Sequence, residues 1–294
     1  MRFIIGVDGG GTGTRARLCN LQGQVLGFGE AGPSGLSQGL EQAWRHVLQA
    51  VRAALAQAGL ADVPFSDCAL GAGLAGAHEA GLKATFLARQ PTQPAFARLV
   101  VDTDGFTALL GAHGGQAGMV LVAGTGSVAE ACWPDGHRHT VGGWGFGVGD
   151  EGSGAWLGLQ AVRHVHHVLD GQTASGPLDR AVLAATGRDT DGMRSWCAQA
   201  GQRAYATLAP LVFDHEATDP HAAALINIAV VSLTELARAL DPAGELPIVC
   251  AGSIAQRLQP RLPPFLQHRC VPSQGDATDG ALHLIRQHLA SETA

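Results

Sequence analysis

The chain alternates short apolar runs with glycine-rich turns and longer amphipathic segments. Apolar runs of about four to eight residues bounded by Gly, Asp or Asn are typical of strands, whereas apolar residues that recur every three or four positions are typical of helices. In the first half the first pattern predicts strands over "RFIIGVD", "TRARLCN", "QVLGFGEA", "CALGAGLAG" and "RLVVDTD". The second pattern predicts helices over 39–58 and 78–89.

The second half repeats this order of elements. Its predicted strands are "GMVLVA", "SVAEACW", "HRHTVGG", "LPIVCAGS" and "HRCVPS", and a closing helix begins near Asp276. A helical insertion over about 153–242 separates the third of these strands from the fourth. The insertion includes an apolar stretch, 225–240, which is shorter than the about 20 residues of a membrane span and carries charged residues, so we predict a buried helix there.

Two glycine-rich turns recur at a single offset. Gly124-Thr125-Gly126-Ser127 follows Gly11-Thr12-Gly13-Thr14 by 113 residues, and each tetrapeptide joins two predicted strands. Because both copies share their flanking elements, they predict a chain of duplicated halves. We predict an N-terminal domain over 1–110, completed by the closing helix over about 276–294, and a C-terminal domain over 111–275. Each is predicted as an α/β domain with a mixed five-stranded sheet flanked by helices.

Composition narrows the class of partner. The formal charge is −6 and Lys and Arg are not clustered, so the positive footprint of a nucleic-acid binder is missing. The N-terminal residues reach glycine and aspartate too early for a signal peptide, which predicts a cytoplasmic protein without a membrane partner. The six cysteines form no C-x-x-C pair and are read as mostly buried apolar residues.

The paired turns favour a phosphate-binding function. Successive backbone N–H groups in such turns form anion sites, and Thr or Ser hydroxyls add donors without bulk. Two loops of this kind suit a nucleoside triphosphate, and the lysine of a P-loop is missing from residues 1–14. Asp8 ends the first strand beside the first loop, where it can hold Mg²⁺ through a water or, alternatively, cap the turn.

Further carboxylates follow the strand "RLVVDTD". Asp102 and Asp104 are two residues apart, and one of them is a candidate to orient an attacking hydroxyl, although capping of the next helix explains them equally well.

The stretch "GGWGFGVGDEGSGAW", residues 142–156, combines seven glycines with Asp150 and Glu151. Carboxylates beside tryptophan faces, here Trp144 and Trp156, are suited to bind a polyol. The alternative is a flexible loop that ends in a helix N-cap.

Taken together, these stretches resemble the sugar-kinase branch of the actin, hexokinase and heat-shock-chaperone ATPase superfamily, and specifically the BadF/BadG/BcrA/BcrD-type ATPases that include N-acetylglucosamine and glucosamine kinases. "DGGGTGT" and "AGTGS" resemble the two phosphate motifs, "AGSI" the adenosine motif, and the 142–156 stretch the loop of N-acetylglucosamine kinases. The resemblance covers nearly the whole chain. It implies duplicated ribonuclease-H-like, actin-like ATPase domains with a cleft between them, and leaves a homodimer open.

The resemblance also assigns roles to individual residues. It makes Asp104, in "TDGFTALLGAHGG", the catalytic aspartate rather than Asp102, and Asp8 the magnesium ligand. It gives nucleotide binding to Gly10, Gly11, Thr12, Gly13, Thr14, Gly124, Thr125, Gly126, Ser127, Gly252 and Ser253. It gives sugar binding to Ser34, Gly35, Asp104, Gly143, Trp144, Asp150 and Glu151.

One departure concerns the sugar. Family members often carry an asparagine where this chain has Gly35, and Ser34, Ser37 or Gln38 are candidates to supply the hydrogen bond instead. The activity implied is transfer of the γ-phosphoryl group of ATP to the 6-hydroxyl of N-acetylglucosamine or glucosamine, with ATP and Mg²⁺. The alternatives are an ATPase activator of a radical dehydratase, a sugar-responsive regulator without enzymatic activity, and an actin-like filament protein.

Overall fold

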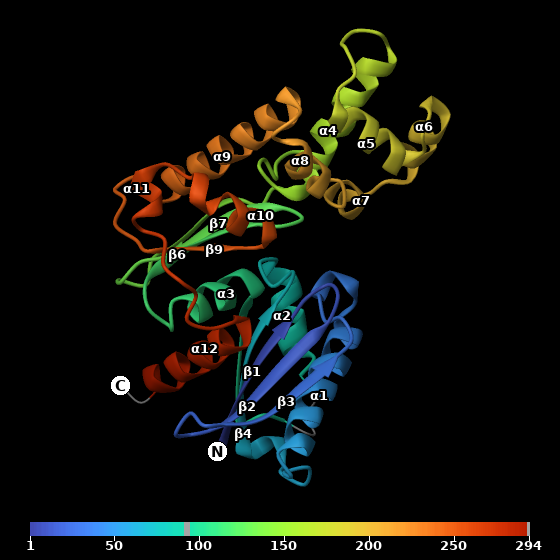
Figure 1. Cartoon of the computed structure of the whole chain (residues 1–294). Helices are drawn as coiled ribbons and strands as arrows, with labels where there is room; N and C mark the ends of the chain where they lie inside the picture. Colours follow the sequence, from blue (N-terminus) through green and yellow to red (C-terminus); the bar gives the residue numbers. More distant parts are fainter. Residues whose placement is uncertain (91–94, 293–294) are drawn as a thin grey trace. The chain divides into compact units, whose positions relative to one another are not determined.

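The structure, a computed structural model, describes residues 1–90 and 95–292. The chain forms two compact units (Figure 1), unit 1 from Met1–Gly118 with Pro272–Ala294 and unit 2 from Met119–Val271. These boundaries lie at 118/119 and 271/272, where the sequence pattern placed them at 110/111 and 275/276. The last two residues of the helix predicted over 276–294 lie outside the described residues.

Unit 1 has a five-stranded mixed sheet in the order β3-β2-β1-β4-β5. β1 pairs antiparallel with β2 and parallel with β4, so the meander β1-β2-β3 is extended by parallel strands. The elements of unit 1 are β1 (Phe3–Gly9), β2 (Thr14–Asn20), β3 (Val25–Ala31), η1 (Leu36–Gln38), α1 (Leu40–Gln57), η2 (Phe65–Asp67), β4 (Cys68–Leu74), α2 (Ala80–Ala88), β5 (Arg98–Thr103), α3 (Asp104–Ala112) and α12 (Ala277–Ser291).

Alternate residues of β1 face two different layers of helix. Ile5 and Val7 pack with the apolar face of α1, whereas Ile4 packs with Leu282 and Ile285 of α12. α1 also lies very close to the edge strand β3, where a Cβ added to either of two strand glycines would meet a backbone carbonyl of α1 at 2.0–2.3 Å. The sheet is therefore covered on both faces, as its two-sided apolar strands require.

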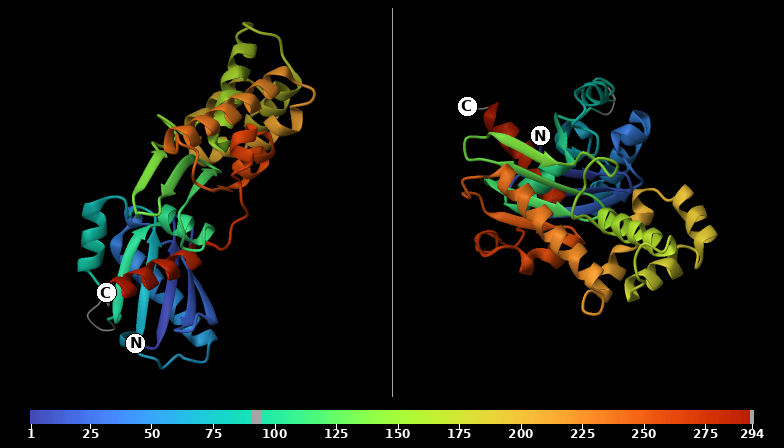
Figure 2. Two further views of the ribbon diagram at one scale, coloured as in Figure 1. Left: turned by 90° about the vertical axis from the view of Figure 1, so that its left-hand side faces the viewer. Right: turned by 90° about the horizontal axis from the view of Figure 1, so that it is seen from above.

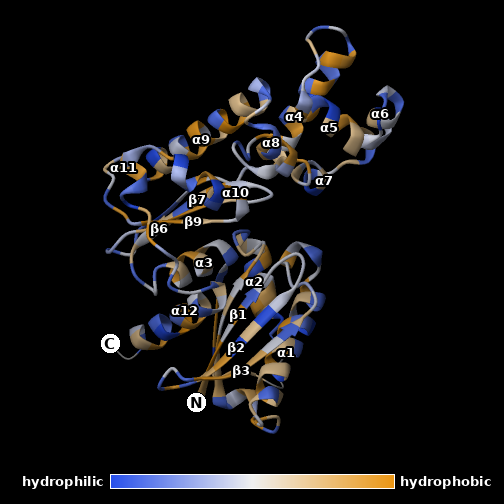
Figure 3. Cartoon of the chain, in the orientation of Figure 1, coloured by the Kyte–Doolittle hydropathy of each residue, from blue (hydrophilic) through white to orange (hydrophobic). Residues whose placement is uncertain are grey.

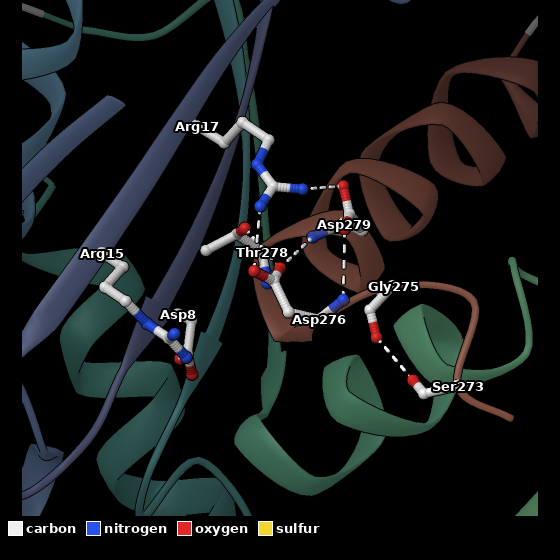
Figure 4. Close-up of polar contacts among 8 residues, drawn as sticks. All are labelled: Asp8, Arg15, Arg17, Ser273, Gly275, Asp276, Thr278 and Asp279. Carbon is white, nitrogen blue, oxygen red and sulfur yellow. Dashed lines mark hydrogen bonds and ion pairs between the residues drawn. The ribbon is translucent and has the colours of Figure 1, made fainter. Parts of the chain in front are cut away.

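A polar network attaches α12 to β2 (Figure 4). The Arg17 guanidinium donates to Asp276 at 2.8 Å and forms a second short contact with Asp279. Asp276 is the N-cap of α12 and accepts the amides of Thr278 and Asp279. Although burial opposes ionisation, the Thr278 hydroxyl, the helix amides and Arg17 lower the pKa of Asp276. The closing helix is thus joined to unit 1 through an ion pair at its positive end.

Unit 2 has a four-stranded sheet in the order β8-β7-β6-β9, with β7 and β8 antiparallel and β6 and β9 parallel. The mixed sheet was predicted, but the fifth strand predicted over "HRCVPS" is reduced to a single bridge between Ile248 and Cys270. Arg269 O and Val271 N form the two hydrogen bonds of this bridge with Ile248, and from Pro272 the chain belongs to unit 1, where Gln274 N donates to Ala112 O at 3.0 Å.

The remaining chain of unit 2 is mostly helical. The helices α4 to α8 extend beyond the sheet (Figure 2), and α9 packs on β7, β8 and α8. The elements are β6 (Gly118–Ala123), β7 (Ser127–Cys132), β8 (Arg138–Gly142), α4 (Gly154–Leu169), α5 (Pro177–Thr186), α6 (Thr190–Gln199), α7 (Gln202–Ala206), α8 (Ala209–His215), α9 (Pro220–Leu240), β9 (Ile248–Ala251), α10 (Ser253–Leu258), η3 (Gln259–Arg261) and α11 (Pro264–Gln267).

α9 is the one helix among the described residues that is long and apolar enough to cross a membrane by length and composition. It carries hydrophilic positions between its hydrophobic ones (Figure 3), and Leu225, Ile226 and Leu233 are buried within unit 2. These contacts explain its apolar composition as that of a core helix.

Candidate active site

The first glycine-rich loop, Gly10 to Gly13, joins β1 to β2. The Gly10 N–H donates to the Gly13 carbonyl at 3.0 Å, and the Gly10 carbonyl accepts from Ser34 N at 3.0 Å and Gly35 N at 3.1 Å. A Cβ added to Gly10 would meet nothing within 4 Å in the described chain. The loop is therefore fixed by the 32–35 segment on one side and is open to a ligand on the other.

Hydroxyl and amide groups brace this loop from within. The buried Thr14 hydroxyl donates to Gly32 O at 2.6 Å and lies 2.7 Å from the hydroxyl of Ser34, which is fully buried. Gln38 Nε2 donates to Gly11 O at 3.1 Å. Ser34 and Gln38, predicted as substitutes for the missing asparagine, therefore bond to the loop in this structure, while Ser37 is exposed.

Asp8 lies opposite Arg15 in the antiparallel register of β1 and β2. Arg15 Nη2 donates to Asp8 Oδ2 at 2.6 Å (Figure 4), and this hydrogen bond raises the pKa of Arg15. Both residues line a cavity of about 440 Å³ together with Gly10, Thr12 and Gly13. The cavity thus combines loop amides, a guanidinium and a carboxylate, a donor set that suits a phosphate with its counter-ion.

The donor set around Asp8 fits a hard divalent cation held with few protein ligands. Mg²⁺ prefers oxygen donors, keeps several waters and uses one or two carboxylates together with substrate phosphates. Asp8 provides one such carboxylate beside the loop, and no cluster of three His, Cys, Asp or Glu side chains that could hold a metal occurs in residues 1–90 and 95–292. The site therefore resembles a water-mediated magnesium site rather than a closed protein cage.

Asp104 is the first residue of α3, directly after β5, and the residue is accessible to solvent although the surrounding chain partly desolvates its carboxyl group. Thr103 caps the helix by accepting Phe106 N at 3.0 Å, and Asp104 Oδ1 accepts Gly105 N at 3.1 Å. The pKa of Asp104 is raised, mainly because the surrounding chain desolvates the carboxyl group and to a smaller extent because of the charge of Asp8. The hydrogen bond from the Gly105 N–H opposes this shift by lowering the pKa. A carboxylate with a raised pKa at a strand end has the properties of a general base.

The strand register brings the carboxylates of unit 1 to one edge of the sheet. Asp8 lies beside Gly73 of β4, and Gly73 lies beside Asp102 of β5. Asp102 Oδ1 accepts the neighbouring amide of Thr103 at 2.8 Å, whereas Asp104 follows at the start of the helix. The carboxyl ends of parallel strands are where α/β sheets bind ligands.

The second glycine-rich loop, Gly124 to Gly126, joins β6 to β7 in unit 2. It closes with a bond from Gly124 N to Gly126 O at 2.9 Å, which spans one residue fewer than the Gly10–Gly13 bond of the first loop. The first amides of α4 bind its carbonyls, Gly154 N to Gly124 O at 2.8 Å and Ala155 N to Thr125 O at 3.1 Å. The loop is thus docked on a helix N-terminus, with Ser153 as the N-cap.

Asp150, predicted to contact the sugar, is buried and braces this second loop. It has a φ of 65°, and its Oδ1 accepts Ser127 N at 3.0 Å while its Oδ2 accepts Gln202 Nε2 at 2.7 Å. A Cβ at position 126 would lie 2.8 Å from Asp150 Oδ1, so glycine is required there. The neighbouring Glu151 is exposed, and its carbonyl accepts the Ser127 hydroxyl at 2.8 Å.

The segment before Asp150 presents apolar side chains to solvent. Trp144 is 79% exposed and Val148 is 80% exposed, and Gly143 lies in the left-handed region at a φ of 72°. Phe146 instead turns to Tyr205 of α7, with ring centroids 5.2 Å apart. The predicted residues Gly143 and Trp144 therefore lie on an accessible loop.

A second cavity, of about 240 Å³, lies beside the second loop in unit 2. Its lining includes Gly124, Thr125 and Ser253. The residue before Ser253, Gly252, has a φ of 85°, and a Cβ added to it would lie 2.5 Å from Ala123 O. The opposite wall is apolar and cationic, with the Arg257 guanidinium 4.1 Å from the ring centroid of Phe213. Because Phe213 is buried beneath Arg257, the planar guanidinium rather than the ring is the surface on which a nucleotide base could stack.

Sequence reasoning missed four residues of these sites: Arg15, Gln202, Phe213 and Arg257. The hairpin register of "VDGGGTGTR" was sufficient to pair Arg15 with Asp8, because four residues separate the two strands. For Gln202 and Phe213, which lie in the helical insertion, the sequence carries no local signal.

The two mixed sheets, each with a glycine-rich loop after its first strand, form an actin-like ATPase fold. The family model for the BadF/BadG/BcrA/BcrD ATPases matches residues 5–263, and the chain belongs to this family.

Named relatives narrow the class further. The chain is 36% identical over 283 residues to the glucosamine kinase GspK of Vibrio cholerae, an alignment that covers 96% of this chain and 95% of that protein. It is similar to the crystal structure of a putative N-acetylglucosamine kinase from Chromobacterium violaceum, with a TM-score of 0.88, 47% identity and coverage of 97% and 99% of the two chains. A glucokinase of the ROK family from Streptomyces griseus, at a TM-score of 0.51, 19% identity and coverage of 97% and 99%, shares the fold.

Proposed function

We propose that this protein is an ATP-dependent amino-sugar kinase that transfers the γ-phosphoryl group of ATP to the 6-hydroxyl of glucosamine or N-acetylglucosamine. Full-length similarity to a glucosamine kinase and to a putative N-acetylglucosamine kinase supports the substrate class. The observation that carries the mechanism is the solvent-accessible Asp104, whose pKa is raised, at the carboxyl edge of the unit 1 sheet.

In this mechanism Asp104 orients the sugar hydroxyl and accepts its proton as the hydroxyl attacks. Phosphoryl transfer passes through a loose transition state, so positioning and charge stabilisation provide most of the catalysis. In unit 1 the amides of the first glycine-rich loop and the Arg15 guanidinium are donors for phosphate oxygens. In unit 2 the amides of the second loop are donors of the same kind, and Arg257 beside them is suited to receive the base. Mg²⁺, held by Asp8 through water, would neutralise phosphate charge. In unit 2 Gly143, Trp144 and Glu151 contribute to sugar binding, and Asp150 contributes by holding their segment against Ser127 and Gln202. In unit 1 the 34–35 turn contributes through its contacts with the first loop.

The proposal is tested by ADP release from ATP and Mg²⁺ with glucosamine, N-acetylglucosamine, glucose or N-acetylmannosamine as acceptor. We expect the two glucosamine-type sugars to be preferred. Asp104→Asn removes the base and is expected to lower kcat by about 10²- to 10⁴-fold. Asp102→Asn is the matched control and should retain most of the activity. Activity retained by Asp104→Asn, or lost equally in both variants, would refute the assignment of the base.

The pH dependence provides a separate check on Asp104. The group acts only when ionised, so kcat/KM is expected to be high above its pKa and to fall as the pH drops through it. Because the pKa is raised from the ordinary aspartate value, the fall begins at a higher pH than for a solvated aspartate. A kcat/KM profile without an acidic limb down to the ordinary aspartate range would contradict this role. We also propose that the enzyme works in the cytoplasm, where ATP is available.

A further inference from the structure

An open groove lies between α4 and α6 in unit 2, outside the sites described above. Its cavity volume is about 640 Å³, within the range of about 300–1,000 Å³ that holds small organic ligands. Its floor is apolar: Val162 of α4 and Met193 of α6 are each 5% exposed, and Leu159 lies beside them. Tyr205 of α7 closes one end. Such a floor favours an aliphatic or aromatic body over a sugar or a nucleotide.

The rim of this groove carries two arginines together with His166 and Asp170, whose Nδ1 and Oδ2 atoms lie 3.7 Å apart, so Arg163 is its unpaired charge within the described residues. Arg163 lines it, is exposed, and has no hydrogen bond or ion pair with any residue in the described part of the chain. Arg194 also lines it, and its contact with Asp191 at 3.6 Å joins two highly exposed side chains, so solvent screens it. An apolar groove with a guanidinium at its rim is complementary to a carboxylate or phosphate joined to an apolar body.

The groove shares a wall with both sites of unit 2 through the short helix α7. Tyr205 lines the groove and contacts Phe146 of the glycine-rich 142–149 loop. Three residues earlier, Gln202 donates to Asp150, and one residue later, Ala206 lines the cavity beside the second phosphate loop. α7 also packs closely on α4, since a Cβ added at Gly158 would lie 1.9 Å from Tyr205 O. A ligand in the groove would therefore act on the Asp150 segment through α7.

We propose that this groove is an effector site for a small amphipathic anion, an apolar chain of about eight to twelve carbons with one carboxylate or phosphate head. The head binds Arg163, the chain lies on Val162 and Met193, and its end contacts Tyr205. Occupancy holds α7 in the arrangement in which Gln202 bonds Asp150. Since the segment is then already ordered, less conformational freedom is lost when the sugar binds.

Binding is tested on the full chain, without sugar or ATP, by isothermal titration calorimetry with decanoate, decyl phosphate and decan-1-ol. We expect saturable binding of an anion, with decan-1-ol at least about tenfold weaker, and the better of the two anions identifies the head group. Arg163→Gln should weaken anion binding at least about tenfold and leave decan-1-ol unchanged. Arg180→Gln, an exposed arginine of α5 outside the groove, is the matched control and should bind like the wild type.

Three results would overturn the proposal. The first is equal anion affinity in the wild type and Arg163→Gln. The second is an equal loss in Arg180→Gln. The third is a dimer, detected by light scattering, that decanoate or Arg163→Gln dissociates, because the groove would then be occupied by a second copy of the chain.

The coupling to the sugar site is tested with the kinase assay. Saturating anion should lower the sugar KM at least about threefold in the wild type, with kcat little changed, and should have no effect in Arg163→Gln. Anion binding without any change in KM would overturn the effector role. This arm depends on the proposed kinase function, whereas the calorimetric arm does not, so failure of one is distinguishable from failure of the other.

Discussion

The two glycine-rich loops have similar sequences but are held in place by different chemistry. Gly11 to Thr14 is braced by neutral groups, the buried hydroxyls of Thr14 and Ser34 and the backbone of the 32–35 segment. Gly124 to Ser127 is braced by the buried carboxylate of Asp150 and by the first amides of α4. One loop is therefore supported by a nearby segment of the same unit, and the other depends on residues of the helical insertion. The same glycine-rich turn thus occurs twice with two different supports.

The largest effect is expected from removal of the carboxylate that braces the second loop. Asp150→Ala leaves Ser127 N–H and the Gln202 amide unpaired in the interior, and we expect a loss of about 3 kcal/mol in the free energy of unfolding. Urea unfolding followed by circular dichroism measures it.

Asp150→Asn is the matched control for that change. Asparagine tolerates the positive φ of this residue and can pair with Ser127 N and with a rotated Gln202 amide, so the stability should be largely retained. A sugar contact by the same carboxylate would then be visible as a raised sugar KM in Asp150→Asn. Equal stability of Asp150→Ala and the wild type would show that the carboxylate does not support the loop.

The next largest effect on stability is expected when equivalent glycines of the two loops are replaced by alanine. A Cβ at position 126 would lie 2.8 Å from Asp150 Oδ1, whereas a Cβ at position 13 would lie 3.6 Å from Ala31 O, an ordinary contact. We therefore expect Gly126→Ala to lower the free energy of unfolding by about 2 kcal/mol or more, and Gly13→Ala to lower it by less than about 1 kcal/mol. The same urea titrations decide this. Similar losses in both variants would mean that the two loops share one mode of support after all.

The amino-acid sequence was sufficient for the parts of the molecule that depend on local pattern. The mixed sheets, the amphipathic α1 and the two phosphate turns follow from strand alternation, helical periodicity and glycine. The partners of those turns do not. Gln202 meets Asp150 across 52 residues of helical insertion, and the Ser34 hydroxyl meets Thr14 only because the chain returns beneath the loop. The lost fifth strand has a similar origin, since the chain leaves β9 after Val271 and Gln274 N instead donates to Ala112 O of unit 1.

The candidate site residues show the same difference between what local sequence pattern predicts and what tertiary contacts decide. Asp8 and Asp104 lie at strand ends, where sequence position alone indicates an accessible carboxylate. Asp150 looked equally accessible in a glycine-rich stretch, but the fold buries it and uses both oxygens. Whether a polar residue in such a stretch faces a ligand or braces the backbone depends on tertiary contacts that sequence pattern does not contain.

The smallest effect is expected from the hydroxyls, and here the two loops should behave alike. Ser34→Ala removes the contact with Thr14, which keeps its bond to Gly32 O, and Ser127→Ala removes the bond to Glu151 O. Each variant loses one neutral hydrogen bond, so we expect the free energy of unfolding, measured with urea, to fall by about 1 kcal/mol in both cases. If Ser127→Ala were far more destabilising than Ser34→Ala, the support of the second loop would lie in its serine rather than in Asp150. Equal losses, together with a large loss in Asp150→Ala, would place the difference between the loops in the buried carboxylate.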